Sequence, residues 1–309
     1  MTVAAVDAVR NRDEGPPPAE TTSELEDREE LAERLAALGA RGELVLFGAG
    51  CAPKRVALPS LERSESADGC LPLGVESPDG GRIARCLSER TEVFASSGSL
   101  DRFVPGCVPA WRPDGTLTVA LDRSVVGVRE CGARRPVCTE PLIPRTELER
   151  AARRHPSVPR GPMRLRALID GIAWVSSTTA AVQLSIRAGG RLGGLGALSA
   201  IAFFENGRLS RAQPYYRVTG GRIAASPLGS YVSMAPDVIL RSDGSQVTLP
   251  EHLRESHAFA WSGDERFLAL ATPHAVHVLD VASLERYDTT GSALRSVTLP
   301  VSAEELSWR

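Results

Sequence analysis

Short apolar segments alternate with compact polar turns along most of this chain. The two clearest turns carry Pro-Asp-Gly, at 78–80 and 113–115, and each lies between two apolar segments. Looser forms of the unit occur at 173–178, 225–229, 260–265 and 306–309. Short apolar runs bounded by turns predict strands, and a unit that returns every few tens of residues is typical of a β-propeller.

The ends of the chain indicate how the ring closes. Residues 306–308 read as an inner strand with nothing after it, and residues 43–58 read as two strands with no inner strand before them. Joined, they form one complete blade and remove the exposed sheet edges that an open ring would leave. We therefore predict an all-β, six-bladed propeller over 43–309, with seven blades as the second option.

Two departures from the repeat are expected. Residues 145–155 are helical in pattern and form an insertion within the propeller. In the unit that begins at His257, we expect the outer strand near Arg286 and Tyr287.

The segment before the propeller divides into two parts. Residues 1–22 are rich in charge and proline and read as a linker or as the stump of a membrane anchor absent from this chain. Residues 23–39 predict an amphipathic helix, with Ser23 as its N-cap and leucines 31, 35 and 38 at helical spacing. The leucines are expected to pack on the propeller or, alternatively, to dock on a partner.

Six cysteines lie between residues 51 and 138, and none forms a CxxC pair. Metal sites built from cysteine need closely spaced ligands, so we favour disulfides formed outside the cytoplasm, with free thiols as the alternative. Six cysteines allow 15 pairings. Pairing of sequence neighbours would join Cys51 to Cys70, Cys86 to Cys107 and Cys131 to Cys138. The single lysine against 35 arginines indicates a GC-rich genome, and we expect a bacterial cell envelope or surface protein.

One copy of the repeat resembles a known family. Ala110-Trp111-Arg112-Pro113-Asp114-Gly115, followed by Leu117-Thr118-Val119-Ala120, is similar to the W-S-P-D-G-x-x-I-A repeat of TolB-type and WD-like propellers. The resemblance implies that the aromatic residue packs between blades and that Asp-Gly supports the turn. The residues given this structural role are Trp111, Asp114, Gly115, Asp79, Gly80, Trp174, Trp261, Asp264 and Trp308.

Residues that would carry chemistry are not recognisable. The sequence has no G-x-S-x-G or HExxH motif, and His274 and His277 would point to opposite faces of one strand. The glycine-rich run 189–196 precedes a strand, so it reads as a hairpin loop, because a phosphate-binding loop leads into a helix. We therefore predict no catalytic, cofactor-binding or metal-binding residue.

These observations favour a non-catalytic binding or scaffold module with a protein partner. A net charge of −2 gives no reason to expect nucleic acid. Contact with a membrane is expected only through the possible N-terminal anchor. One alternative is a hydrolase or lyase acting on a glycan or lactone in the central channel, and another is a subunit of a cell-surface assembly.

Overall fold

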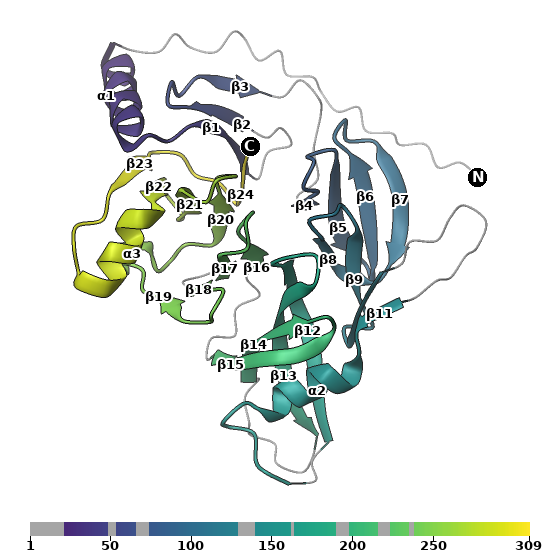
Figure 1. Ribbon diagram of the computed structural model, residues 1–309. Coiled ribbons are helices and arrows are strands. Elements are labelled where there is room, and N and C mark those ends of the chain that lie inside the picture. The colour runs from purple at the N-terminus through teal and green to yellow at the C-terminus, as the bar shows by residue number, and fades with distance from the viewer. Residues whose placement is uncertain are drawn as a thin grey trace, which may run out of the picture.

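The computed structural model describes residues 22–48, 54–65, 74–128, 140–161, 164–189, 198–215, 223–234 and 238–309. These residues form six four-stranded sheets that follow one another around a ring (Figure 1). Neighbouring strands within the sheets are antiparallel, as expected for short meanders. The predicted six-bladed β-propeller is confirmed.

We number the blades along the chain and give their strands from the innermost outward. Blade 1 contains β24 (Glu305–Trp308), β1 (Gly42–Phe47), β2 (Lys54–Leu58) and β3 (Arg63–Glu65). Blade 2 contains β4 (Val75–Glu76), β5 (Arg82–Leu87), β6 (Arg90–Ala95) and β7 (Leu100–Pro105). Blade 3 contains β8 (Cys107–Trp111), β9 (Leu117–Leu121), β10 (Val125–Val128) and β11 (Glu140–Ile143).

The second half of the ring has the same order of strands within each blade. Blade 4 contains β12 (Arg164–Trp174), β13 (Thr179–Gly189), β14 (Leu198–Glu205) and β15 (Arg208–Tyr215). Blade 5 contains β16 (Ile223–Ala225), β17 (Tyr231–Met234), β18 (Val238–Arg241) and β19 (Gln246–Val247). Blade 6 contains β20 (Ala258–Trp261), β21 (Phe267–Ala271), β22 (Val276–Asp280) and β23 (Ser296–Leu299).

Blade 1 closes the ring by joining the two ends of the chain. The C-terminal strand β24 pairs with β1, with Trp308 opposite Leu44 and Leu306 opposite Leu46. The backbones of Glu43 and Arg309 exchange two hydrogen bonds of 2.9 Å. The predicted closure is therefore confirmed, and it gives the inner strand β24 a partner within its own blade.

The hydrophobic core lies between the blades. Among the described residues, five buried clusters join blades 2 and 3, 3 and 4, 4 and 5, 5 and 6, and 6 and 1. A propeller is built this way because each blade is apolar on both faces and covers one face on each neighbour. The seam between blades 1 and 2 has no such cluster among the described residues.

The α-helices contribute to these clusters. Helix α1 (Thr22–Leu38) places Leu35 and Leu38 in the cluster between blades 6 and 1, and Leu31 packs against it. Helix α2 (Arg145–Arg153) forms at the expected insertion, and Leu148 is fully buried between blades 3 and 4. The apolar faces of both helices are thus used within the fold.

The prediction of an outer strand near Arg286 and Tyr287 is wrong. These residues lie in helix α3 (Val281–Thr290), and the outer strand is β23. Asp280 caps the helix by accepting a 3.1 Å hydrogen bond from the backbone N–H of Ala282, and Gly291 ends it in the left-handed conformation. These two capping residues determine that this segment is helical. A short 3₁₀-helix, η1 (Glu251–Leu253), precedes blade 6.

Candidate functional site

The repeated turn residues stabilise the inner hairpins. The carboxylate of Asp79 accepts hydrogen bonds from the Ser77 hydroxyl at 2.6 Å and from the backbone N–H two residues ahead at 3.1 Å. Asp264 does the same with Ser262, and Asp114 accepts from the backbone of Thr116. These hydrogen bonds hold the pKa of each carboxyl below its ordinary value.

The glycines of these turns have a conformational role. Gly80 has a φ of +67° and Gly115 a φ of +82°, a region that residues with a Cβ rarely adopt. The corresponding position of the blade 6 turn is occupied by Glu265, with a φ of +57°. The carboxylate of Glu265 accepts hydrogen bonds from the backbone of Leu228 at 2.6 Å and of Ser230 at 3.3 Å, in the turn of blade 5. A strained residue therefore connects two neighbouring turns.

Three of the four tryptophans lie in seams between blades. Trp111, Trp174 and Trp261 are all buried, and each indole N–H donates to the preceding blade. The acceptors are the Val75 carbonyl at 2.9 Å, the Thr118 hydroxyl at 2.8 Å and the Ser233 hydroxyl at 3.2 Å. These contacts place each of the three indoles against the preceding blade.

Sequence reasoning missed the two hydroxyl acceptors. Thr118 lies opposite Ala110 in blade 3, and Ser233 lies opposite Ala224 in blade 5, so the two occupy equivalent register positions. The equivalent residue of blade 6 is Ala269. A sequence signal for these acceptors existed. It is a Ser or Thr on the second strand of a blade when the next blade along the chain carries the tryptophan.

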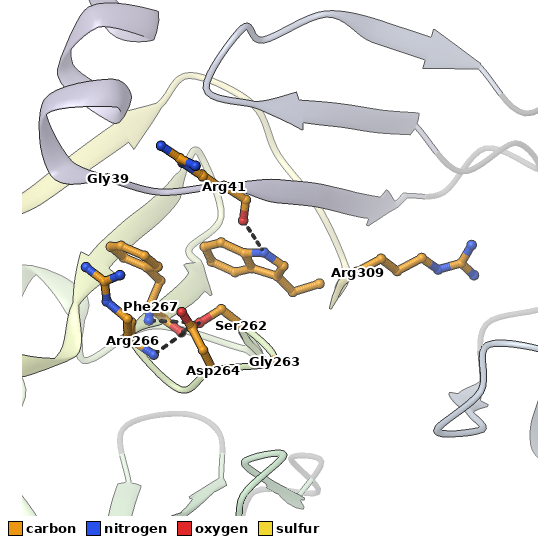
Figure 2. A pocket seen from close by; sticks show the side chains of 9 residues that line it. Gly39, Arg41, Ser262, Gly263, Asp264, Arg266, Phe267 and Arg309 are labelled. Atoms are coloured by element: carbon orange, nitrogen blue, oxygen red, sulfur yellow. Dashed lines mark hydrogen bonds between the residues drawn. The ribbon is translucent and has the colours of Figure 1, made fainter.

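Trp308 differs from the other three tryptophans. Its indole N–H donates to the backbone carbonyl of Arg41 at 3.1 Å, in the segment before β1, and not to the preceding blade. Its ring is only partly buried and stacks with Phe267, with 6.1 Å between the ring centroids. It lines a pocket of about 490 Å³ between the turn of blade 6 and the segment that joins α1 to β1 (Figure 2).

A central channel of about 1260 Å³ is lined mainly by the inner strands and their turns. Most of its lining side chains are small or apolar, which is typical of a ligand cavity or a structural tunnel. Two of its titratable residues already have partners. Glu76 accepts from the Ser307 hydroxyl at 2.9 Å and forms an ion pair with Arg309, and His257 lies 2.7 Å from the Ala303 carbonyl.

Glu76 also explains the character of the seam between blades 1 and 2. In blade 2, Glu76 lies opposite Ile83, and in blade 3, Trp111 lies opposite Leu117. Glu76 therefore occupies in blade 2 the position that a tryptophan occupies in blade 3. Its bonds to Ser307 and Arg309 join the inner strands of the two blades. Polar pairing thus replaces apolar packing at the inner end of this seam.

The face of blade 2 away from blade 3 carries exposed apolar side chains. Leu87, Leu100 and Phe103 are exposed by 47%, 47% and 48%. Only one other large apolar residue of the described chain is exposed, Leu228 at 71% in the turn of blade 5. Strand pairing places Arg90 between Leu87 and Pro105, and Glu92 between Arg85 and Phe103, so these residues share one face.

Two arginines lie over aromatic rings on this same face. The guanidinium carbon of Arg90 is 4.1 Å from the ring centroid of Phe103, and that of Arg85 is 4.8 Å from the centroid of Phe94. The nearly buried carboxylate of Glu92 pairs with both arginines, at 2.8 Å and 3.6 Å. One carboxylate therefore orients two cations, and the face keeps an excess of positive charge. We call it the blade 2 face, defined by Arg85, Leu87, Arg90, Glu92, Phe94, Leu100 and Phe103.

The structure contains a disulfide between Cys86 and Cys107, which joins β5 of blade 2 to β8 of blade 3. This is one of the three pairings expected from sequence neighbours. Cys51, Cys70, Cys131 and Cys138 lie outside the described residues, so their pairings stay predictions, as does the linker over residues 1–21.

The histidines form a contact that the sequence did not indicate. His252 of η1 and His277 of β22 lie edge to face, with ring centroids 6.1 Å apart. Within the described ranges, no group of three or more His, Cys, Asp or Glu side chains could hold a metal ion. Of the helices described, none is both long and apolar enough to cross a membrane.

The sequence matches no known family profile and no curated protein sequence. Solved structures with a similar arrangement of the chain do exist. One is a proposed 6-phosphogluconolactonase from Bacteroides fragilis NCTC 9343, at 10% identity, with 87% of this chain and 98% of that chain covered and a TM-score of 0.47. Another is the β-propeller domain of Myceliophteria thermophila Cps50 (Swd1), at 11% identity, 87% and 90% coverage and a TM-score of 0.46.

The C-terminal WD40 domain of Sif2 is also similar, at 12% identity, with 86% of this chain and 82% of that chain covered and a TM-score of 0.39. WD40 propellers are among the similar structures. A TolB-type family is not identified by any of these comparisons. Similarity at this level concerns the fold alone, and the functional argument below rests on this chain's own residues.

Proposed function

We propose that this protein is a non-catalytic, protein-binding or scaffold propeller whose contact surface is the blade 2 face. The observation that carries this proposal is the concentration of exposed apolar residues there. Three of the four large apolar side chains that are exposed in the described chain lie on this one sheet face. Clustered exposed apolar surface marks a site of interaction more often than scattered residues do.

The chemistry of the face indicates the kind of partner. Phe103 and Leu87 offer apolar contact, and the stacked Arg85 and Arg90 add two oriented donors. Arginine and aromatic residues are enriched where interfaces have their strongest contacts. The net positive charge of the face favours a partner segment with apolar side chains flanked by carboxylates.

We further propose an extracytoplasmic location, in a bacterial envelope or at its surface. The disulfide between Cys86 and Cys107 supports it, since disulfides persist mainly in oxidising compartments. A tether through an N-terminal anchor remains part of this proposal. Mass spectrometry of protein from its native host would contradict the location if Cys86 and Cys107 carried free thiols.

Two other functions are retained as alternatives. A hydrolase or lyase that acts on a glycan or lactone would use the central channel, where Glu76 and His257 are two of the titratable lining residues. A subunit of a cell-surface assembly would use the outer surfaces of the blades. Turnover of a lactone or glycan that is lost when Glu76 is changed to Gln would favour the enzyme.

The test compares three forms of the full chain as bait in an envelope extract of the native host. The test variant is Leu87→Ser/Phe103→Ser, and the matched control is Leu228→Ser, which removes an even more exposed apolar side chain on blade 5. Exposed substitutions of this kind change stability by about 0.5 kcal/mol, so folding is preserved. Proteins captured by each bait are identified by mass spectrometry.

We expect wild type and Leu228→Ser to retain a common partner that Leu87→Ser/Phe103→Ser loses. Capture of the same proteins by all three baits would contradict the assignment of the blade 2 face. Loss of the partner from both variants would show that general surface hydrophobicity, and no particular face, is responsible.

A further inference from the structure

A second candidate site lies on the other side of blade 1, at the pocket beside Trp308. The pocket is formed by three elements that are distant in sequence. They are the turn Ser262–Arg266 and Phe267 of blade 6, the segment Gly39–Arg41 after α1, and the closing strand β24 with Trp308 and Arg309. Figure 2 shows Gly39 and Arg41 on one side of the pocket and the turn Ser262–Arg266 of blade 6 on the other, and Trp308 contacts both sides through the Arg41 carbonyl and the Phe267 ring. The pocket therefore exists only when the ring is closed.

The walls of the pocket are aromatic. The Trp308 ring stacks nearly parallel to Phe267, with an interplanar angle of 16°, and its N–H is held by the Arg41 carbonyl. These contacts fix the indole, and part of it stays accessible within the pocket. A fixed aromatic surface of this kind offers stacking to a flat apolar group.

Three guanidinium groups surround the aromatic wall. Arg309 is engaged by Glu76, and Figure 2 shows its side chain extending away from Arg41 and from the turn of blade 6. Arg266 lies over the ring of Phe267 at 5.5 Å, which orients it. Within the described chain, neither Arg41 nor Arg266 forms an ion pair, and both are exposed.

One carboxylate, that of Asp264, also lines the pocket, and it is already hydrogen-bonded within its own turn. Asp264 accepts hydrogen bonds from the Ser262 hydroxyl and from the backbone N–H of Arg266. Arg41 and Arg266 against the one carboxylate of Asp264 leave the side chains around the pocket with a net positive charge, since Arg309 is paired with Glu76. A guanidinium is a planar fork that matches the two oxygens of a carboxylate.

We propose that this pocket binds a carboxylate attached to a flat apolar group, with the group against Trp308 and the carboxylate on Arg41 and Arg266. A volume of about 490 Å³ is within the usual range for sites of small organic ligands. The carboxylate can belong to a free small molecule or to an acidic side chain of a peptide. The site is separate from the blade 2 face and does not depend on it.

The experiment measures binding to the full chain by isothermal titration calorimetry at low salt. The probe is N-acetyl-phenylalanine, and the matched ligand is its amide, which has the same ring and no carboxylate. The peptide acetyl-Gly-Phe-Glu-Gly-amide, with its ring and an acidic side chain, distinguishes the peptide source from the free acid. Variants are Arg41→Gln/Arg266→Gln, the milder Arg266→Lys, and Arg286→Gln as a control on the exposed face of α3.

We expect saturable binding of a carboxylate probe, at least tenfold weaker binding of the amide, and a loss of at least tenfold in Arg41→Gln/Arg266→Gln. Arg286→Gln should bind as wild type does. Arg266→Lys keeps the charge without the planar fork, so binding should weaken only in part. Tighter binding of the free acid than of the peptide assigns the site to small molecules, and the reverse order assigns it to a protein segment.

Three results would overturn the proposal. The first is the absence of saturable binding for both carboxylate probes, and the second is equal binding of acid and amide. The third is unchanged binding in Arg41→Gln/Arg266→Gln and in Arg266→Lys. Trp308 fluorescence provides an independent readout, because a ligand stacked on the indole changes its emission. If Arg41→Gln/Arg266→Gln does not fold, as judged by circular dichroism, the comparison of Arg266→Lys with Arg286→Gln decides the matter. Each outcome is independent of the capture experiment on the blade 2 face.

Discussion

The hydrogen bond between Trp174 and Thr118 offers the sharpest test of how the blades are held together. The indole N–H of Trp174 donates to the Thr118 hydroxyl at 2.8 Å, and that hydroxyl donates to the Ala110 carbonyl at 2.8 Å. Thr118 is fully buried and Trp174 is 9% exposed. A change of Thr118 to Val keeps the shape of the side chain and removes both hydrogen bonds.

The expected cost follows from the polar groups that are left without partners. An unsatisfied buried donor costs about 1–3 kcal/mol, and an ordinary hydrogen bond contributes about 1 kcal/mol. Thr118→Val should therefore lower the free energy of unfolding by about 2–4 kcal/mol. Thr118→Ser keeps the hydroxyl and loses one methyl group, so it should cost about 1 kcal/mol.

The measurement is urea unfolding followed by circular dichroism, with Trp174→Phe added to complete a double-mutant cycle. In the Trp174→Phe background there is no indole N–H for Thr118→Val to leave without an acceptor. The loss of unfolding free energy caused by Thr118→Val should therefore be smaller there by about 1–2 kcal/mol. The reasoning would be refuted if Thr118→Val cost no more than Thr118→Ser, or if its cost were the same in both backgrounds.

Three further predictions concern other seams and turns. Burial, together with a hydrogen bond to a nearby carboxylate, raises the pKa of Tyr231 to about 12, so absorbance at 295 nm should show one phenol that ionises near pH 12 and is absent in Tyr231→Phe. The folded state holds that proton more tightly, so the contribution of this phenol to the free energy of unfolding is complete below pH 10 and is lost as the pH rises through about 12. The variant Tyr231→Phe should lack this loss. Although burial raises the pKa of Glu265, hydrogen bonds from the blade 5 turn lower it below its ordinary value. Its contribution is therefore present above about pH 4.5 and is lost as the pH falls further, and the stability difference between wild type and Glu265→Gln, about 1–3 kcal/mol at pH 7, should shrink in acid unfolding curves. Joint replacement of Cys86 and Cys107 by Ser, 21 residues apart, should lower the unfolding free energy by about 3 kcal/mol, and an unchanged urea midpoint would contradict this.

The repeat unit was readable because it depends on local chemistry. Pro-Asp-Gly specifies a turn through the carboxylate of Asp79 or Asp114 and the positive φ of Gly80 or Gly115. The same locality explains where prediction failed. The segment around Arg286 was assigned to a strand by analogy with the repeat, although its own capping residues specify a helix.

The candidate sites were not readable, because the pocket gathers residues far apart in the chain and the blade 2 face depends on the exact pairing of three strands. The pocket at Trp308 combines Arg41 with Arg266, and the blade 2 face depends on strand register that places Arg90 over Phe103. Sequence reasoning gave all four tryptophans one structural role. The structure separates Trp308 from the others because its indole N–H donates to Arg41, outside the preceding blade, and its ring is only partly buried.

The sequence alone determined the architecture: six repeats of strand and turn, an N-terminal helix, and a last blade completed by the first strands. Short-range hydrogen bonds and alternating apolar residues are sufficient to specify such units one at a time. Only the tertiary structure decided which seam lacks an apolar cluster among the described residues, which apolar side chains stay exposed, and which tryptophan lines a pocket. Those features are differences between neighbouring blades, and they exist only once the ring has closed and each blade has met the next.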